Sequence, residues 1–176
     1  MRTPAAAVGS VLFFAIAPGV VAGVVPWWLT GWQMRGPLAR WAPVRTAGMI
    51  MFILGAIALV QAFARFVAEG RGTPAPAAPT ERLVIGGLYR YVRNPMYLAV
   101  VAVITGQALA LGQPVLLGYA AAVWLTTAAF VRWYEEPALA RQFGAQYEAY
   151  RRGVPAWRPR TRPWKQGLPA APPSRR

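Results

Sequence analysis

The sequence predicts an all-α polytopic membrane protein with about four transmembrane helices plus a C-terminal amphipathic helix at the membrane interface. Two observations predict this class. Of the 176 residues, 56% are hydrophobic and only 14% are charged, whereas about a quarter of the residues in soluble domains are charged. The apolar residues also gather in long runs, and a soluble core of this size could not bury so many of them.

The first apolar run covers residues 5–29 and is long enough to cross a hydrocarbon core about 30 Å thick. Pro18 predicts a kink within it, and the tryptophans at its end are typical of a membrane interface. A cleavable signal peptide is the alternative, but its apolar core spans only about 7–15 residues. We therefore expect a retained membrane helix.

The second run, over residues 44–67, is apolar on all sides, as a lipid-embedded helix is. Residues 70–80 are rich in Pro, Ala and Gly and predict a flexible linker. This break divides the chain into two N-terminal scaffold helices (1–69), the linker, a functional half (81–155) and a basic tail rich in Pro and Trp (156–176).

The third run begins at Asn94, a favoured N-cap residue that is followed by proline, a favoured first helical residue. It ends near Leu111, where a Gly-Gln-Pro turn leads into a fourth run that ends near Tyr134. These two runs predict a helical hairpin. A further helix is expected to begin at Pro137, and its apolar residues share one face, as in a helix lying on a membrane surface.

The charge is strongly positive, with 19 Lys and Arg against 5 Asp and Glu. The arginines flank apolar runs and form no nucleic-acid-binding motif, so anionic membrane lipids are the expected counter-charge. The positive-inside rule places both termini and the central linker in the cytoplasm, and the cell inner (plasma) membrane is the expected location. With no Cys and no His, disulfides, thiolate nucleophiles and imidazole bases are excluded, and no metal site is expected.

Two polar clusters lie at the cytoplasmic ends of the predicted hairpin. In residues 86–97, arginines lead into a helix N-terminus, which favours an anion, although a membrane anchor explains the cluster equally well. In residues 132–137, Glu136 lies four residues after Arg132 and can simply pair with it, so Glu135 is the stronger functional candidate. Because the hairpin brings its ends together, we expect the two clusters to face each other and to suit a zwitterionic ligand.

Three blocks of residues resemble one known family. They are residues 87–97 (GLYRYVRNPMY), the Glu135-Glu136 pair, and residues 143–150 followed by Val154-Pro155. Over residues 81–155 the chain resembles the isoprenylcysteine carboxyl methyltransferase and phospholipid methyltransferase superfamily of membrane enzymes. The resemblance implies methyl transfer from the cofactor S-adenosylmethionine to a lipophilic small-molecule or lipid substrate at the membrane–cytoplasm boundary.

The resemblance also implies which residues form the site. The implied cofactor contacts are Glu81, Arg82, Leu83, Val84, Tyr89, Arg93, Asn94, Pro95, Met96, Tyr97 and Glu135. Arg132 is the residue expected to steer an anionic group of the substrate, so Arg132 and Glu135 are the expected catalytic residues. The acceptor channel is expected to include Trp124, Phe130 and Trp133, although ordinary packing explains these aromatic residues as well.

One departure from the family bears on the acceptor. The isoprenylcysteine enzymes have Arg-His-Pro where this chain has Arg93-Asn94-Pro95. Asn forms hydrogen bonds but cannot act as a base. A carboxylate or thiolate acceptor is already ionised and needs mainly correct positioning. The sequence therefore favours such an acceptor over a phospholipid amine, which is the alternative.

Two other classes of function compete with an enzyme. One is a non-enzymatic membrane assembly or lipid-binding protein on the same scaffold, but such a protein would have no reason to keep Tyr89, Asn94, Tyr97 and Glu135 together. The other is a transporter, which is disfavoured because no acid lies inside a predicted span and no inverted repeat is present.

Overall fold

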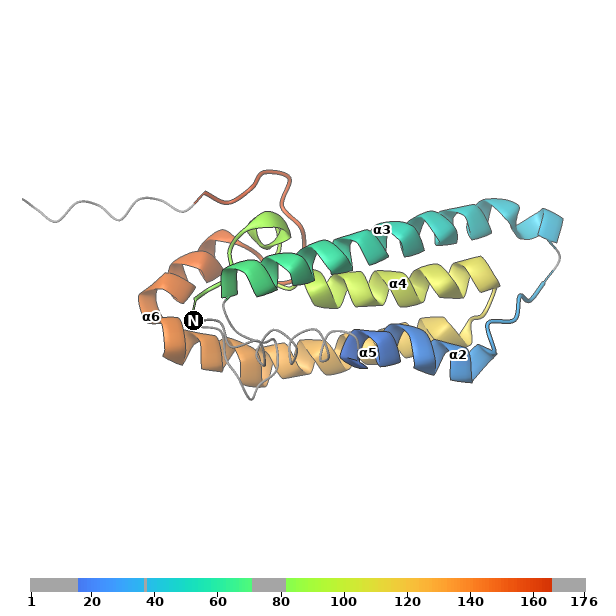
Figure 1. The fold of residues 1–176 in the computed structure, drawn as a ribbon, viewed down its shortest axis with the longest axis horizontal. Helices are drawn as coiled ribbons and strands as arrows, with labels where there is room; N and C mark the ends of the chain where they lie inside the picture. Colours follow the sequence, from blue (N-terminus) through green and yellow to red (C-terminus); the bar gives the residue numbers. More distant parts are fainter. Residues whose placement is uncertain (1–15, 37, 71–81, 166–176) are drawn as a thin grey trace, which may run out of the picture.

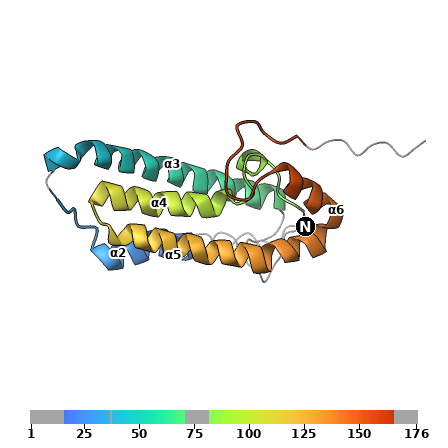
Figure 2. The same cartoon turned by 180° about the vertical axis from the view of Figure 1, so that it is seen from behind.

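The structure is a computed structural model that describes residues 16–36, 38–70 and 82–165. Every regular element in these ranges is helical, which confirms the all-α class. In chain order the elements are η1 (Val20–Val24), α2 (Val25–Thr30), α3 (Leu38–Gly70), η2 (Gly87–Arg90), α4 (Pro95–Leu111), α5 (Val115–Phe130), η3 (Val131–Glu135) and α6 (Glu136–Gly153). Helix α4 packs against both α3 and α5, and α6 bends across one end of the bundle (Figures 1 and 2).

Two helical stretches are long and apolar enough to cross a membrane, Ala42–Glu69 and Val115–Gly153. Two shorter apolar stretches, Ile16–Thr30 and Pro95–Leu111, accompany them. Membrane helices are thus supported by length and composition, while the predicted count of four spans is not confirmed. Residues 5–15 of the first run and residues 71–80 of the linker lie outside the described ranges.

Helices α3 and α4 approach closely because glycines face one another. A Cβ on Gly106 of α4 would lie 2.5 Å from the backbone nitrogen of Phe52, and one on Gly48 of α3 would lie 2.5 Å from that of Ala110. Small residues of this kind let membrane helices pack backbone against backbone. The second predicted run is helical as expected, and the helix extends beyond residues 44–67, from Leu38 to Gly70.

Near Pro18, where the sequence predicts a kink, the helix passes into the π-helix η1, which begins two residues later. A π-turn disturbs the regular α-helical hydrogen bonds, and the affected carbonyls need other partners. The Tyr119 hydroxyl donates to the Val21 carbonyl at 2.9 Å, and Gln107 Nε2 donates to the Ala22 carbonyl at 2.7 Å. These two bonds attach the N-terminal helix to α4 and α5.

The predicted hairpin is present, with the boundaries that the sequence indicates. Helix α4 begins directly after Asn94 and ends at Leu111, and Gly112 follows in the left-handed region at φ +66°. One detail differs from the prediction, because the Asn94 side chain makes no capping hydrogen bond with α4. The side-chain amide of Asn94 instead donates a hydrogen bond to the Ala156 carbonyl.

The predicted break before Pro137 is wrong, because helix α5 continues through the π-helix η3 into α6. The Glu136 N–H donates to the carbonyl of Val131, five residues back. Proline clashes with the carbonyl four residues before it in a regular α-helix, and the wider π-turn accommodates this clash. The chain changes direction later, at Gly144 (φ 49°, ψ −125°).

The apolar face of α6 is covered by the protein itself. Tyr147 and Tyr150 are 2% and 3% exposed and form a core cluster with Val154. Leu83 and Trp164 pack against this cluster. The amphipathic pattern of α6 therefore arises from packing within the protein. Its apolar side chains contact the segment before η2 and the segment after α6.

Candidate functional site

A cavity of about 710 Å³ is lined by residues of the N-terminal helix, α3, α4, α5, η3 and α6. Its size falls within the roughly 300–1,000 Å³ that small-molecule sites occupy. One part is apolar and is formed by Val21, Leu59, Val100 and Val123. The other part carries the polar side chains of η2, the start of α4, η3 and α6. A ligand with one charged and one apolar end matches this division.

Glu135 lies at the polar part of the cavity, at the last position of η3. Its Oε2 accepts a hydrogen bond of 3.0 Å from the hydroxyl of Tyr97, in the first turn of α4. Within the described part of the chain, Glu135 forms no salt bridge. Its carboxylate therefore lies at the cavity with a neutral hydrogen-bond donor and without a salt bridge to any described residue.

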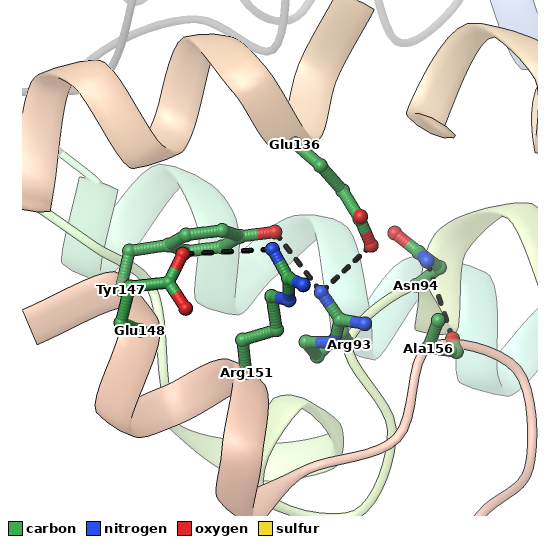
Figure 3. A network of polar contacts seen from close by, with 7 residues as sticks. All are labelled: Arg93, Asn94, Glu136, Tyr147, Glu148, Arg151 and Ala156. Carbon is green, nitrogen blue, oxygen red and sulfur yellow. Dashed lines mark hydrogen bonds and ion pairs between the residues drawn. The ribbon is translucent and has the colours of Figure 1, made fainter. Parts of the chain in front are cut away.

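Glu136 also lines the cavity and is paired with Arg93. Figure 3 shows the Arg93 guanidinium between the Glu136 carboxylate, at 2.8 Å, and the Tyr147 hydroxyl, at 3.0 Å. The pairing of Glu136 with Arg132, the alternative offered by their spacing, is not made. The structure thus brings the two predicted clusters together, as the hairpin predicts.

One polar atom of the Arg93 side chain has no hydrogen-bond partner among the described residues. This atom, Nε, is buried, while the side chain as a whole is 12% exposed. A buried donor without a partner costs about 1–3 kcal/mol, and a charged one costs more. Arg93 as a residue lines the cavity, so its guanidinium is a candidate partner for an anionic group of a ligand.

The residues after α6, 154–165, form what we call the C-terminal strap. The Arg93 N–H donates to the Pro155 carbonyl (3.0 Å), and Asn94 Nδ2 donates to the Ala156 carbonyl (3.2 Å). Further along, the Arg160 N–H donates to the Tyr91 carbonyl at 2.9 Å. The strap therefore holds the loop that carries Arg93 and Asn94 (Figure 3). The sequence assigned residues 156–165 of this segment to a basic tail, because backbone hydrogen bonds between distant segments leave no sequence signal.

Tyr89, in η2, is buried and lines the cavity. Its backbone carbonyl accepts a 2.7 Å hydrogen bond from the Tyr150 hydroxyl. Burial, reinforced by nearby Tyr150, Glu135 and Glu69, raises the pKa of the Tyr89 hydroxyl well above its ordinary value. The group therefore stays protonated near neutral pH and acts as a neutral polar group rather than as a base.

Most of the residues predicted for the site line the cavity. They are Leu83, Val84, Tyr89, Arg93, Asn94, Pro95, Met96, Tyr97 and Glu135. Glu81 lies outside the described residues. Arg132 is exposed and is not among the described lining residues, so its role stays a prediction. Of the aromatic residues expected in an acceptor channel, Phe130 lines the cavity, whereas Trp124 and Trp133 do not.

Several lining residues were not predicted. Ala17, Pro18 and Val21 come from the N-terminal helix, and Leu59 and Phe66 come from α3. The two N-terminal helices are therefore more than a scaffold, since they form part of the cavity wall. From α6, the unpredicted lining residues include Arg141, Tyr147 and Tyr150. Apolar residues in membrane helices carry no sequence mark that separates cavity-facing from lipid-facing positions, which explains the omission.

The comparisons with known proteins agree with this description. A family model described as phospholipid methyltransferase matches residues 44–146, which is more than half of the chain. The chain therefore belongs to the phospholipid methyltransferase family, part of the superfamily that its motifs resemble. This membership makes it a membrane methyltransferase. Neither the search of curated proteins nor that of solved structures found a match.

Methyltransferases of this family depend in general on S-adenosylmethionine. That cofactor carries a carboxylate, an ammonium group and a sulfonium. The polar part of the cavity fits these groups, because it is lined by Arg93, a cation, and by Glu135, a carboxylate that forms no salt bridge with any described residue. A donor and an acceptor of opposite charge at one end of a cavity suit a zwitterion.

Proposed function

We propose that the protein transfers a methyl group from S-adenosylmethionine to a lipophilic acceptor that carries a carboxylate or a thiolate. The observation that carries the proposal is the cavity itself, whose polar part is lined by Arg93 and Glu135 and whose other part is apolar. When bound, S-adenosylmethionine supplies an electrophilic methyl group on sulfur. The residues of the chain supply binding, orientation and exclusion of water.

On this proposal Arg93 and Glu135 hold the two charged ends of the amino-acid part of the cofactor. The Glu136 carboxylate keeps the Arg93 guanidinium in place from one side, and the Tyr147 hydroxyl does so from another. The Tyr97 hydroxyl orients the Glu135 carboxylate. Groups that are fixed in this way lose little freedom when a ligand binds, and the fixed geometry favours an in-line transfer.

The acceptor takes the apolar part of the cavity, between the N-terminal helix, α3, α4 and α5. The chain contains no His and no Cys, and the Tyr89 hydroxyl is held protonated. An acceptor that is already ionised needs no base, which favours a carboxylate or thiolate. The apolar wall keeps water from the nucleophile.

A phospholipid amine is the second candidate acceptor, and the description of the matching family favours it. Glu135, whose carboxylate forms no salt bridge with a described residue, also suits an ammonium headgroup. An amine must lose a proton before it accepts a methyl group, and the described lining residues offer no imidazole for this step.

We further propose that the site faces the cytoplasm, with both termini on the same side of the cell inner membrane. The arginines around the cavity end and the strap support this orientation through the positive-inside rule. Anionic lipid headgroups are the proposed partners of these arginines, each worth about 1 kcal/mol near the surface.

The proposal is tested by isothermal titration calorimetry of S-adenosylmethionine into the detergent-purified protein. We expect saturable binding with one site per chain. Methyl transfer is then followed with radiolabelled cofactor on two acceptors, a prenylated cysteine analogue and vesicles of phosphatidylethanolamine. Absence of binding would refute the enzyme proposal, and transfer to phosphatidylethanolamine alone would replace the carboxylate or thiolate with the amine.

The wall formed by the N-terminal helix gives a separate prediction. In Val21→Trp, the larger ring is expected to fill the apolar part of the cavity and to raise the KM for the acceptor by roughly tenfold or more. Val24→Trp is the matched control, because Val24 lies in the same π-helix but is 53% exposed and is not among the described lining residues. Cofactor affinity is measured alongside by calorimetry. An equal loss of cofactor affinity in Val21→Trp would contradict the placement of the acceptor.

A further inference from the structure

We propose that Trp157 of the C-terminal strap is a positioning residue for this site. It braces the ring of Tyr97, and the Tyr97 hydroxyl in turn orients the Glu135 carboxylate. The inference rests on the proposed function, because it takes Glu135 as a ligand of S-adenosylmethionine. Trp157 itself is not among the described residues that line the cavity, so it acts through Tyr97 and not by touching the ligand.

Trp157 lies between two helices of the hairpin. Its ring centroid is 6.5 Å from that of Tyr97 in α4, with an interplanar angle of 41°. On the α5 side it is 6.2 Å from the ring of Trp124, in an edge-on arrangement of 71°. Both distances fall within the roughly 4.5–7 Å at which aromatic pairs attract each other. The indole therefore bridges the two helices beside the cavity.

The backbone on both sides of Trp157 is hydrogen-bonded to the loop that carries Arg93 and Asn94. The two residues before it accept hydrogen bonds, Pro155 from the Arg93 N–H and Ala156 from the Asn94 side chain. Three residues after it, the Arg160 N–H donates to the Tyr91 carbonyl. An indole on a backbone attached at both sides can hold a neighbouring ring in one position.

A change at Trp157 is expected to affect Glu135 through one hydrogen bond, which the Tyr97 hydroxyl donates to the Glu135 carboxylate. The Tyr97 hydroxyl lies 3.0 Å from Glu135 Oε2, and it is the described hydrogen-bond donor to this carboxylate. A Tyr97 ring without Trp157 beside it has more room to turn, which lengthens this hydrogen bond. A carboxylate without a fixed donor is less pre-organised for a cationic group.

The test compares Trp157→Ala with Trp157→Phe and with the control Trp28→Ala, whose indole is 76% exposed on α2. An aromatic contact of this kind corresponds to a change in affinity of about two- to tenfold. We expect Trp157→Ala to weaken S-adenosylmethionine binding in calorimetry by that factor, Trp157→Phe to restore most of it, and Trp28→Ala to leave it unchanged.

Two double variants separate positioning from general stability. In a Tyr97→Phe background, which keeps the ring but lacks the hydroxyl, Trp157→Ala is expected to have no further effect on affinity. In ligand-free protein, Trp157→Ala is expected to lower the Tm less in a Tyr97→Ala background than in the unmutated chain, because the shared ring contact is already lost.

The outcomes distinguish the two proposals. An unchanged affinity in Trp157→Ala, or an effect that persists fully in Tyr97→Phe, overturns the positioning role. Additive Tm changes in the ligand-free protein overturn the brace itself, whether or not the cofactor binds. Failure of the unmutated protein to bind S-adenosylmethionine overturns the proposed function, and the ligand-free measurement still decides whether Trp157 braces Tyr97.

Discussion

Replacing the carboxylate in Glu135→Gln is expected to weaken S-adenosylmethionine binding by roughly 30-fold or more. Removing one partner of a buried, hydrogen-bonded charge pair costs about 2–5 kcal/mol, from which this factor follows. The amide oxygen of Gln still accepts the hydrogen bond from Tyr97, so the fold around the site should be unchanged. Calorimetry on the purified variant measures the loss, and a Tm close to that of the unmutated protein shows that the fold is intact.

Glu148→Gln is the matched control for this prediction. Glu148 is 42% exposed and pairs with Arg151 at 3.5 Å on the surface of α6 (Figure 3). Exposed pairs of this kind contribute about 0–1 kcal/mol, so cofactor binding should not change. Intact binding by Glu135→Gln would refute the role given to Glu135, while leaving the cofactor proposal itself standing.

The second large effect concerns the packing of α3 against α4. In Gly106→Val the new Cβ would lie 2.5 Å from the Phe52 backbone nitrogen and 2.8 Å from the Gly48 carbonyl oxygen. Neither backbone atom can move aside without separating the helices. Overpacking typically costs about 1–3 kcal/mol, so we expect the Tm to fall by about 2–12 °C.

The cavity should be disturbed in the same variant, because Leu59 of α3 and Val100 of α4 both line it. Gly118→Val is the matched control, since a Cβ on Gly118 of α5 meets nothing within 4 Å. Thermal unfolding in detergent measures both variants. Equal Tm values for the two would contradict the close approach of α3 and α4.

Local signals in the sequence predicted the elements correctly where a few neighbouring residues decide the structure. The start of α4 after Asn94 and its end at Leu111 follow from a proline at the first helical position and a glycine that accepts positive φ. The juxtaposition of the two polar clusters followed from the short turn between α4 and α5. The boundaries of α4 and the turn that follows it each depend on residues close together in the chain, and the hairpin then brings the two clusters together.

Two other predictions were wrong, one because the local backbone adopts a π-helix and one because a distant residue provides the partner. The break expected at Pro137 is absent, because the π-helix η3 just before it lets the helix continue past the proline. Both Glu135 and Glu136 line the cavity. The spacing of Arg132 and Glu136 suggested a pair, but Glu136 is bound by Arg93, which is 43 residues earlier in the chain. Packing of the helices decides whether Glu136 pairs with the nearby Arg132 or with the distant Arg93. The spacing of residues along the sequence contains no information about this packing.

By itself, the sequence determined that this protein is a helical membrane protein, where its hairpin begins and ends, and which residues are chemically able to form a site. Composition and local capping suffice for this, because helix formation and burial in lipid depend on each residue and its near neighbours. Only the tertiary structure decided which partners these residues take. It placed the strap against the loop of Arg93 and Asn94, and the N-terminal helix along the cavity. Such contacts join segments that are distant in sequence, and they exist only once the helices have packed.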